Sequence, residues 1–306
     1  MKKQSKIPIY AALSANIGIG ITKFIAAYFS SSSAMLSEGI HSLVDSGSEL
    51  LLLLGIKRSK KAADEQHPFG YGKEIYFWTL IVSIVIFSLG GGMSIYEGIS
   101  HFLYPEPIKK PVWNYIVLGT AACFEGISFI VAFRSFSAQM GNKSFWEELR
   151  LSKDPSLFAI IYEDGAALIG LVIAFVGIFC TQYFQEPRID GIASVLIGLL
   201  LVMVSLVMVR ESRNLLVGES AEIETVRAIY KLVNDDPDVY TLRQPVTMHL
   251  APDEILLVLD VQFRRDISSQ DIARIINRLE NSIRLKYPEV KRIYVEARIL
   301  VHQSPL

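Results

Sequence analysis

Two side chains four residues apart, His41 and Asp45, stand inside an apolar run of helix length. On an α-helix, residues i and i+4 lie one turn apart on the same face. An imidazole and a carboxylate placed in this way form half of a tetrahedral site for a metal such as zinc. Because ionisable side chains are costly inside a membrane, the pair is a candidate functional site. The alternative is a structural hydrogen bond between helices.

A second acidic pair, Glu163 and Asp164, occurs in a later apolar run. At the helical rise per residue, Asp45 lies about 17 Å from the outer end of its run and Asp164 about 12 Å from the inner end. In a hydrocarbon core of about 30 Å these depths nearly coincide. We therefore expect one metal site with His41, Asp45 and Asp164 as ligands. Its fourth ligand is Glu163, Asn16 or water, and Glu163 is alternatively a protonated carboxyl bonded between helices.

The other charged residues of the apolar runs are Lys23, Glu38, Glu49, Glu97, Glu125 and Asp190. Lys23 and Glu38 each lie about one to two turns from the outer end of a run, so we expect them to form an ion pair. Glu125 lies deep in another run and is either a proton relay or a tie between helices. In a polar loop, Asp64 and His67 are three residues apart, a spacing that fits either a second metal site or a solvated turn.

The elements that must position these residues are membrane spans. Of the 306 residues 51% are hydrophobic and only 20% charged, and the mean hydropathy is +0.36. A soluble domain usually carries more charge. Six windows are long and apolar enough to cross a bilayer: Ile7–Phe29, Ala34–Ile56, Ile75–Ile99, Trp113–Phe133, Ser156–Tyr183 and Ile189–Val209. Gly90, Gly91 and Gly92 in the third window predict close packing of helices.

The distribution of basic residues predicts the orientation. Lysines and arginines are concentrated before the first window and after the second and fourth windows, which places both termini in the cytoplasm. The pattern and the scarcity of cysteine fit a bacterial inner membrane, with an organelle as the alternative. Cys123 and Cys180 lie inside windows, so we expect neither a disulfide nor a thiolate metal site. A net charge of −1 gives no indication of a nucleic-acid partner.

After the sixth window the long apolar runs end, and the sequence becomes a mixture of apolar and charged residues. We expect a transmembrane domain over residues 1–210 and a cytoplasmic α+β dimerisation domain over residues 211–306. In the second domain the pattern predicts the order α-β-β-α-β, with a three-stranded sheet covered by two helices. The predicted elements are Glu222–Val233, Val246–Leu250, Ile255–Phe263, a helix from Ser268 or Ser269 to about Tyr287, and Lys291–Leu300.

Taken together, the six windows, the segment Ser37–Asp45, the loop His67–Gly72 and the α+β tail resemble the cation diffusion facilitator family of divalent-metal/proton antiporters. The resemblance covers nearly the whole chain. It implies a Y- or V-shaped homodimer that exports metal by alternating access. We expect the cytoplasmic domains to join the two copies, either alone or together with the membrane domains. It also implies two ligands from the second span, which match His41 and Asp45, and two from the fifth, of which Asp164 matches the second.

The sequence departs from the family pattern at several ligand positions. Ile160 replaces the first ligand of the fifth span, and the adjacent acids Glu163 and Asp164 look like those of a subgroup with an acidic pair there. In the loop, Tyr71 stands where some members have a histidine. In the tail, Tyr240, Asp260 and Val295 stand where zinc-binding members often have histidines. We therefore predict a tail that dimerises without sensing metal through a binuclear cluster.

The expected function is efflux of a divalent transition-metal ion in exchange for protons. A histidine ligand favours zinc over manganese, because oxygen-only sets suit harder ions, and iron, cobalt and manganese are the alternatives. The ion is transported cargo, and no permanently bound cofactor is expected. A passive cation channel is the second hypothesis, which flux against a gradient separates from the first. An intramembrane metalloenzyme is disfavoured because a His-Glu-x-x-His helix is absent from the sequence. A sensor or scaffold acting through the tail alone leaves the intramembrane acids unexplained.

Overall fold

The structure of this chain is a computed structural model that divides into two compact units. The first comprises Met1–Lys57 with Glu74–Arg213, and the second comprises Arg58–Lys73 with Asn214–Leu306. The structure describes residues 7–108, 111–137, 145, 147, 149, 152–264 and 267–298, with the backbone alone for residues 7–15, 111, 135, 156 and 157. Most of the polar segment 138–151 therefore lies outside the described residues.

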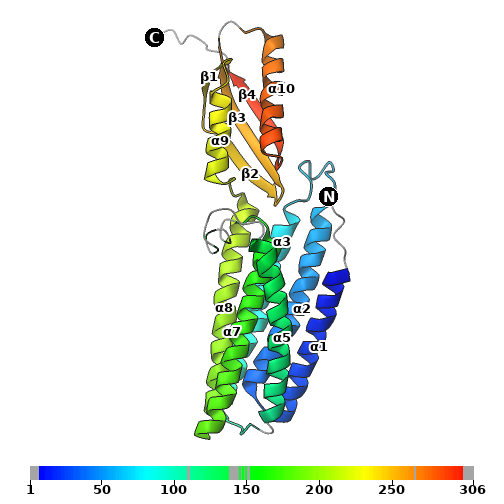
Figure 1. The fold of residues 1–306 in the computed structure, drawn as a ribbon, viewed down its shortest axis with the longest axis vertical. Helices are drawn as coiled ribbons and strands as arrows, with labels where there is room; N and C mark the ends of the chain where they lie inside the picture. The colour runs from blue at the N-terminus through cyan, green and yellow to red at the C-terminus, as the bar shows by residue number, and fades with distance from the viewer. Residues whose placement is uncertain are drawn as a thin grey trace. The chain divides into compact units, whose positions relative to one another are not determined.

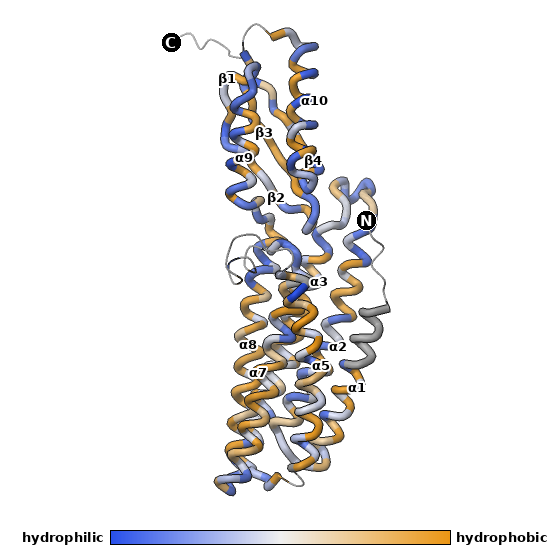
Figure 2. Tube along the Cα trace, in the orientation of Figure 1, coloured by the Kyte–Doolittle hydropathy of each residue, from blue (hydrophilic) through white to orange (hydrophobic). Residues whose placement is uncertain are grey.

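The first unit is a bundle of long helices that run alongside one another (Figure 1). Its elements are α1 (Ile7–Ser30), α2 (Ser33–Ser59), α3 (Glu74–Val85), the π-helical η1 (Ile86–Gly92), α4 (Met93–Leu103), α5 (Pro111–Ser137), α7 (Pro155–Phe184) and α8 (Arg188–Val217). Helix α5 contacts both α1 and α7, and α3 contacts α7. The helices are predominantly apolar along their length (Figure 2), and many large apolar side chains, such as Ile127, Val172 and Met203, are exposed. Exposed apolar surface on this scale fits contact with lipid.

Five of the predicted spans are helices long and apolar enough to cross a membrane. The first predicted span is helical from Ile7 onward, although its side chains before Asn16 lie outside the described residues. The third span is one continuous segment, Glu74–Leu103, whose middle seven residues are π-helical. The sequence did not predict this change in hydrogen-bond pattern. Short π-helical insertions within α-helices occur frequently at functional sites.

Glycines in η1 and α4 allow the close packing of helices that the sequence predicts. A Cβ atom added at Gly91 would lie 2.6 Å from Val202 Cγ2, and one added at Gly98 would lie 2.7 Å from the carbonyl oxygen of Gly191. Because neither residue has a side chain, the backbones of η1 and α4 approach α8 closely.

The start of α2 is fixed by Asp190 of α8. The buried Asp190 carboxylate accepts hydrogen bonds from the backbone amides of Ser33 and Ala34 and from the hydroxyl of Ser32. A carboxylate at this position satisfies amides that have no partner within the helix. His101 of α4 contributes to the same cluster, with Nδ1 3.4 Å from Asp190 Oδ2. This cluster sets the position of the helix that carries His41 and Asp45.

The tail has one strand more than predicted. Its elements are α9 (Ile223–Asn234), β1 (Val239–Leu242), β2 (Val246–Ala251), β3 (Glu254–Phe263), α10 (Ser269–Lys286) and β4 (Val290–Arg298). The order is therefore α-β-β-β-α-β, and the expected three-stranded sheet has four strands. Strand β1 is only four residues long, too short to show the period-two alternation on which a prediction from sequence depends. The predicted cap of α10 is confirmed, since Ser268 Oγ accepts from the backbone amide of Asp271 at 3.2 Å.

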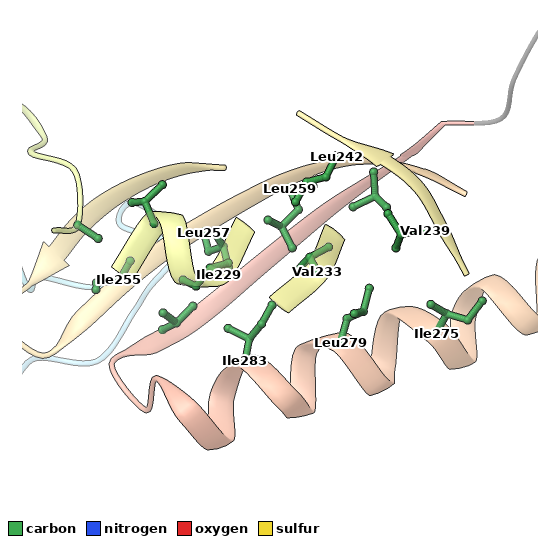
Figure 3. Close-up of a cluster of buried hydrophobic side chains, with 14 of the residues drawn as sticks. Ile229, Val233, Val239, Leu242, Ile255, Leu257, Leu259, Ile275, Leu279 and Ile283 are labelled. Atoms are coloured by element: carbon green, nitrogen blue, oxygen red, sulfur yellow. The ribbon is translucent and has the colours of Figure 1, made fainter. Parts of the chain in front are cut away.

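The central strand of the tail is β3. Strand β4 runs parallel to it and pairs over nearly its whole length, from Ile255 to Gln262. Strands β1 and β2 both run antiparallel to β3 and pair with its other edge. Strand β2 pairs with the first half of β3, and β1 pairs with the last residues of β3. Helices α9 and α10 cover the sheet with buried residues such as Ile229, Leu279 and Ile283 (Figure 3).

Candidate metal site in the helical unit

Helix α2 turns a polar face toward the interior of the bundle. Its buried polar residues are Ser33, Ser37, Glu38, His41, Ser42, Ser46 and Ser48. Leu43 and Leu50 on the same helix are exposed. The helix therefore has polar groups on the face toward the bundle interior and apolar groups on the outer face. This arrangement is expected for a span that lines a pathway through a membrane bundle.

His41 and Asp45 lie together on this polar face. The distance from His41 Nε2 to Asp45 Oδ2 is 3.4 Å, and only 2% of the His41 residue is exposed. Among the described residues, neither ring nitrogen of His41 has a hydrogen-bond partner, and neither has Asp45 Oδ1. A buried polar atom without a partner is costly, so it requires an explanation. A cation that both side chains bind would supply one.

The two acids of α7 lie close to this pair. Glu163 and Asp164 both interact electrostatically with Asp45. Glu163 is buried, and its Oε1 has no hydrogen-bond partner among the described residues. Asp164 Oδ2 accepts a hydrogen bond from the hydroxyl of Ser128 on α5 at 2.9 Å. Three helices thus contribute to one acidic region.

The candidate ligands are not assembled into a coordination sphere. Among the described residues, no three His, Cys, Asp or Glu side chains come together closely enough to hold a metal ion. Asn16, a candidate fourth ligand, donates its amide to Glu49 at 2.8 Å. Ile160 is 36% exposed and contributes no ligand atom. The structure therefore gathers His41 with Asp45 and brings the α7 acids near, without closing the site.

Glu49 is a residue to which the sequence analysis assigned no role. It lies one turn beyond Asp45 on α2, and it interacts electrostatically with both Asp164 and Glu163. Its Oε2 has no hydrogen-bond partner among the described residues. The signal was present in the sequence, because His41, Asp45 and Glu49 repeat at intervals of four and must share one helix face.

Lys23 of α1 lies at the centre of a second polar cluster. Its ammonium donates to Glu38 Oε2 at 3.0 Å, to Ser42 Oγ at 2.8 Å and to Glu125 Oε1 at 2.8 Å. The expected ion pair between Lys23 and Glu38 is present. Glu125, for which the sequence offered no partner, is held by the same ammonium from α5. The cluster ties together α1, α2 and α5.

The loop candidates, Asp64 and His67, lie in the second unit and form a compact turn. Asp64 accepts hydrogen bonds from the Tyr71 hydroxyl at 2.7 Å, from Lys61 Nζ at 3.0 Å and from the backbone amide of His67 at 2.8 Å. These bonds, that from Tyr71 foremost, hold the pKa of Asp64 well below its usual value. The His67 ring packs on Tyr71, with 4.2 Å between centroids. A metal would have to displace Lys61 from Asp64.

The three tail positions that lack histidine have structural contacts instead. Asp260 lies 3.4 Å from Arg243 and 3.0 Å from Arg298 across the sheet. Val295 packs against the hydrophobic core, and Tyr240 is exposed. These side chains offer one carboxylate, which is already paired with two arginines.

Comparison with known proteins identifies relatives over most of the chain. Residues 9–217 match the family model described as the cation efflux transmembrane domain. The human proton-coupled zinc antiporter SLC30A9, a mitochondrial protein, is 31% identical over 275 residues, which are 87% of this chain and 48% of that protein. Metal tolerance protein C4 of Arabidopsis thaliana is 28% identical, over 91% of this chain and 61% of the relative. The chain thus spans about half the length of the human relative and under two thirds of the plant one.

A bacterial relative matches over nearly its full length. The manganese efflux system protein MneP of Bacillus subtilis is 24% identical over 304 residues, which are 96% of this chain and 94% of MneP. The names of these relatives differ in the metal, zinc in one and manganese in another.

Proposed function

The chain belongs to the cation diffusion facilitator family, whose members are transporters and not enzymes, and we propose that it exports a divalent transition-metal ion from the cytoplasm in exchange for protons. The observation that carries the proposal is the pair formed by buried His41 and partly buried Asp45. Among the described residues, both ring nitrogens of His41 and Oδ1 of Asp45 lack hydrogen-bond partners, and Asp45 interacts electrostatically with the acids of α7. A structural hydrogen bond between helices would leave fewer of these atoms unsatisfied.

We propose His41, Asp45 and Asp164 as ligands of the transported ion, with Glu163 as the fourth. Glu163 is preferred to Asn16 because its buried Oε1 has no hydrogen-bond partner in the part of the chain that the structure describes, whereas the Asn16 amide is bonded to Glu49. Alternating access moves one part of a helical bundle against another around the binding site, and we expect this motion to bring the four ligands together around the ion. Zinc is the proposed cargo because the set includes an imidazole, which oxygen-preferring manganese does not favour. Iron, cobalt and manganese are the alternative cargoes.

Proton exchange follows from the chemistry of these ligands. An imidazole must be neutral and a carboxylate ionised to bind a metal, so binding of the ion releases protons and binding of protons releases the ion. A proton gradient can then drive the metal against its own gradient. We further propose a homodimer in a bacterial inner membrane, with both termini cytoplasmic, and the positive-inside pattern of the sequence supports that orientation.

Zinc flux into liposomes under an imposed pH gradient tests the proposal. An antiporter loads zinc against its own gradient and stops when the proton gradient is collapsed, whereas a passive channel only equilibrates zinc. Asp45→Asn and Asp164→Asn should each abolish this uptake. The matched control is Asp253→Asn, a turn residue of the tail that pairs with Lys291 at 2.9 Å and should leave uptake unchanged. Normal transport by both span variants would show that the site assignment is wrong.

A further inference from the structure

Lys23 is the only lysine or arginine among the buried residues of the described chain. Its side chain is fully buried, and all three ammonium protons have oxygen acceptors, on Glu38, Ser42 and Glu125. An ammonium surrounded by three oxygens at 2.8–3.0 Å has the environment of a bound cation.

This cluster holds two carboxyl groups for one ammonium. Among the described residues, each carboxyl group keeps one oxygen without a hydrogen-bond partner, Glu38 Oε1 and Glu125 Oε2. Isolated negative charge inside a bundle is expensive, so these oxygens are available to a second cation. A cluster that served only to tie helices together would gain more from complete pairing.

The same cluster adjoins the proposed metal site. Ser42 follows His41 directly on α2, and Glu125 interacts electrostatically with both Asp45 and Asp164. Lys23 itself interacts electrostatically with His41 and Asp45. The ammonium and a metal ion at His41 and Asp45 would therefore repel each other while attracting the same carboxylates.

We propose that Lys23 is a built-in cation that competes with the transported metal for Glu125. When the metal is absent, the ammonium holds Glu125; when the metal is present, Glu125 is drawn toward it and the Lys23 contact weakens. Lys23 thus sets the affinity of the site and promotes release of the ion without touching the metal. This inference rests on the proposed function, because it assumes a metal at His41 and Asp45.

Zinc binding to the purified full-length protein in lipid nanodiscs, measured by calorimetry, tests the competition. Lys23→Met should lower the Kd for zinc by about tenfold, because one repelling charge is removed and Glu125 is freed. Lys23→Arg keeps the charge and should bind zinc within about threefold of the native protein. Zinc efflux by Lys23→Met should show a lower KM together with a lower kcat, since the ion is released more slowly.

Tighter zinc binding by Lys23→Met could also come from the change in net charge, and a variant of unchanged formal charge separates the two causes. Lys23→Met combined with Glu38→Gln has the same net charge as the native cluster but still frees Glu125 from the ammonium. It should also bind zinc about tenfold more tightly, and adding Glu125→Gln should reverse that gain. Native-like affinity of the charge-matched variant, with an unchanged elution profile, would overturn the proposal. So would equally tight binding by Lys23→Arg and Lys23→Met.

The same titration separates this inference from the function on which it rests. Asp45→Asn should lose zinc binding altogether. If Asp45→Asn binds zinc normally, the proposed site is wrong. If Asp45→Asn loses zinc but the Lys23 variants keep the native Kd, the site stands and only the competition is refuted.

Discussion

Asp164 of α7 accepts a hydrogen bond from the hydroxyl of Ser128 on α5, with 2.9 Å between the two oxygens. A hydrogen bond of this kind orients a carboxylate, and loss of such a supporting partner typically weakens a metal site about 10- to 100-fold. We expect Ser128→Ala to raise the KM for zinc about tenfold with a smaller effect on kcat, measured as liposome flux. Ser128→Thr retains a hydroxyl and should restore most of the affinity. An unchanged KM in Ser128→Ala would argue that Asp164 does not bind the ion.

The fourth ligand can be assigned by comparing two variants. Glu163→Gln removes a charge with little change in shape, and we expect it to raise the Kd for zinc about tenfold, which is about 1.4 kcal/mol. Asn16→Ala breaks the bond to Glu49 and should change the Kd less than about threefold, because the one hydrogen bond of this amide among the described residues goes to Glu49, which is not a proposed ligand. Calorimetry on both variants makes the comparison. A larger loss in Asn16→Ala than in Glu163→Gln would reverse the assignment.

The Asp64 turn should be insensitive to pH across the physiological range. Its folded pKa is depressed, so its contribution to stability is present above the unfolded value, about 3.9, and is lost only as pH falls through the lower folded value. Hydrogen exchange at the His67 amide, which donates to Asp64, should therefore show the same protection from pH 8 to pH 5.

Asp64→Asn provides the contrast, because it weakens the charge-assisted bonds from Tyr71 and Lys61 and should accelerate exchange of the His67 amide. Loss of protection between pH 8 and pH 5 in the native protein would contradict this prediction.

The parts of the fold that the sequence predicts are those governed by a long regular pattern. Apolar runs predicted the spans, and spacing by four predicted that His41 and Asp45 lie on one face of α2. Strand β1 was missed because four residues show no clear period. The π-helical segment η1 was missed because glycines indicate close packing without revealing which amide bonds to which carbonyl.

Contacts between distant residues were the hardest to predict. Glu125 lies 102 residues from Lys23, and counting residues along a helix gives depth in the membrane but not the direction in which a side chain points. The capping of α2 by Asp190 was missed for the same reason, since the two are 157 residues apart at Ser33. Pairing of this kind depends on which helices are neighbours, which a single sequence does not give.

Adjacent glycines in η1 allow a final test of the packing against α8. A Cβ at Gly91 would lie 2.6 Å from Val202 Cγ2 and 3.1 Å from the carbonyl oxygen of Gly198, so Gly91→Ala must push the two helices apart. We expect a loss of about 1–3 kcal/mol, as for other overpacked positions. Gly92→Ala is the matched control, since Gly92 is exposed and its added Cβ would approach only Phe87 O, at 3.8 Å. Both substitutions have the same intrinsic helix propensity, so any difference in apparent Tm in detergent reports the contact with α8. Equal Tm values for the two variants would mean that η1 does not pack on α8 in the folded protein.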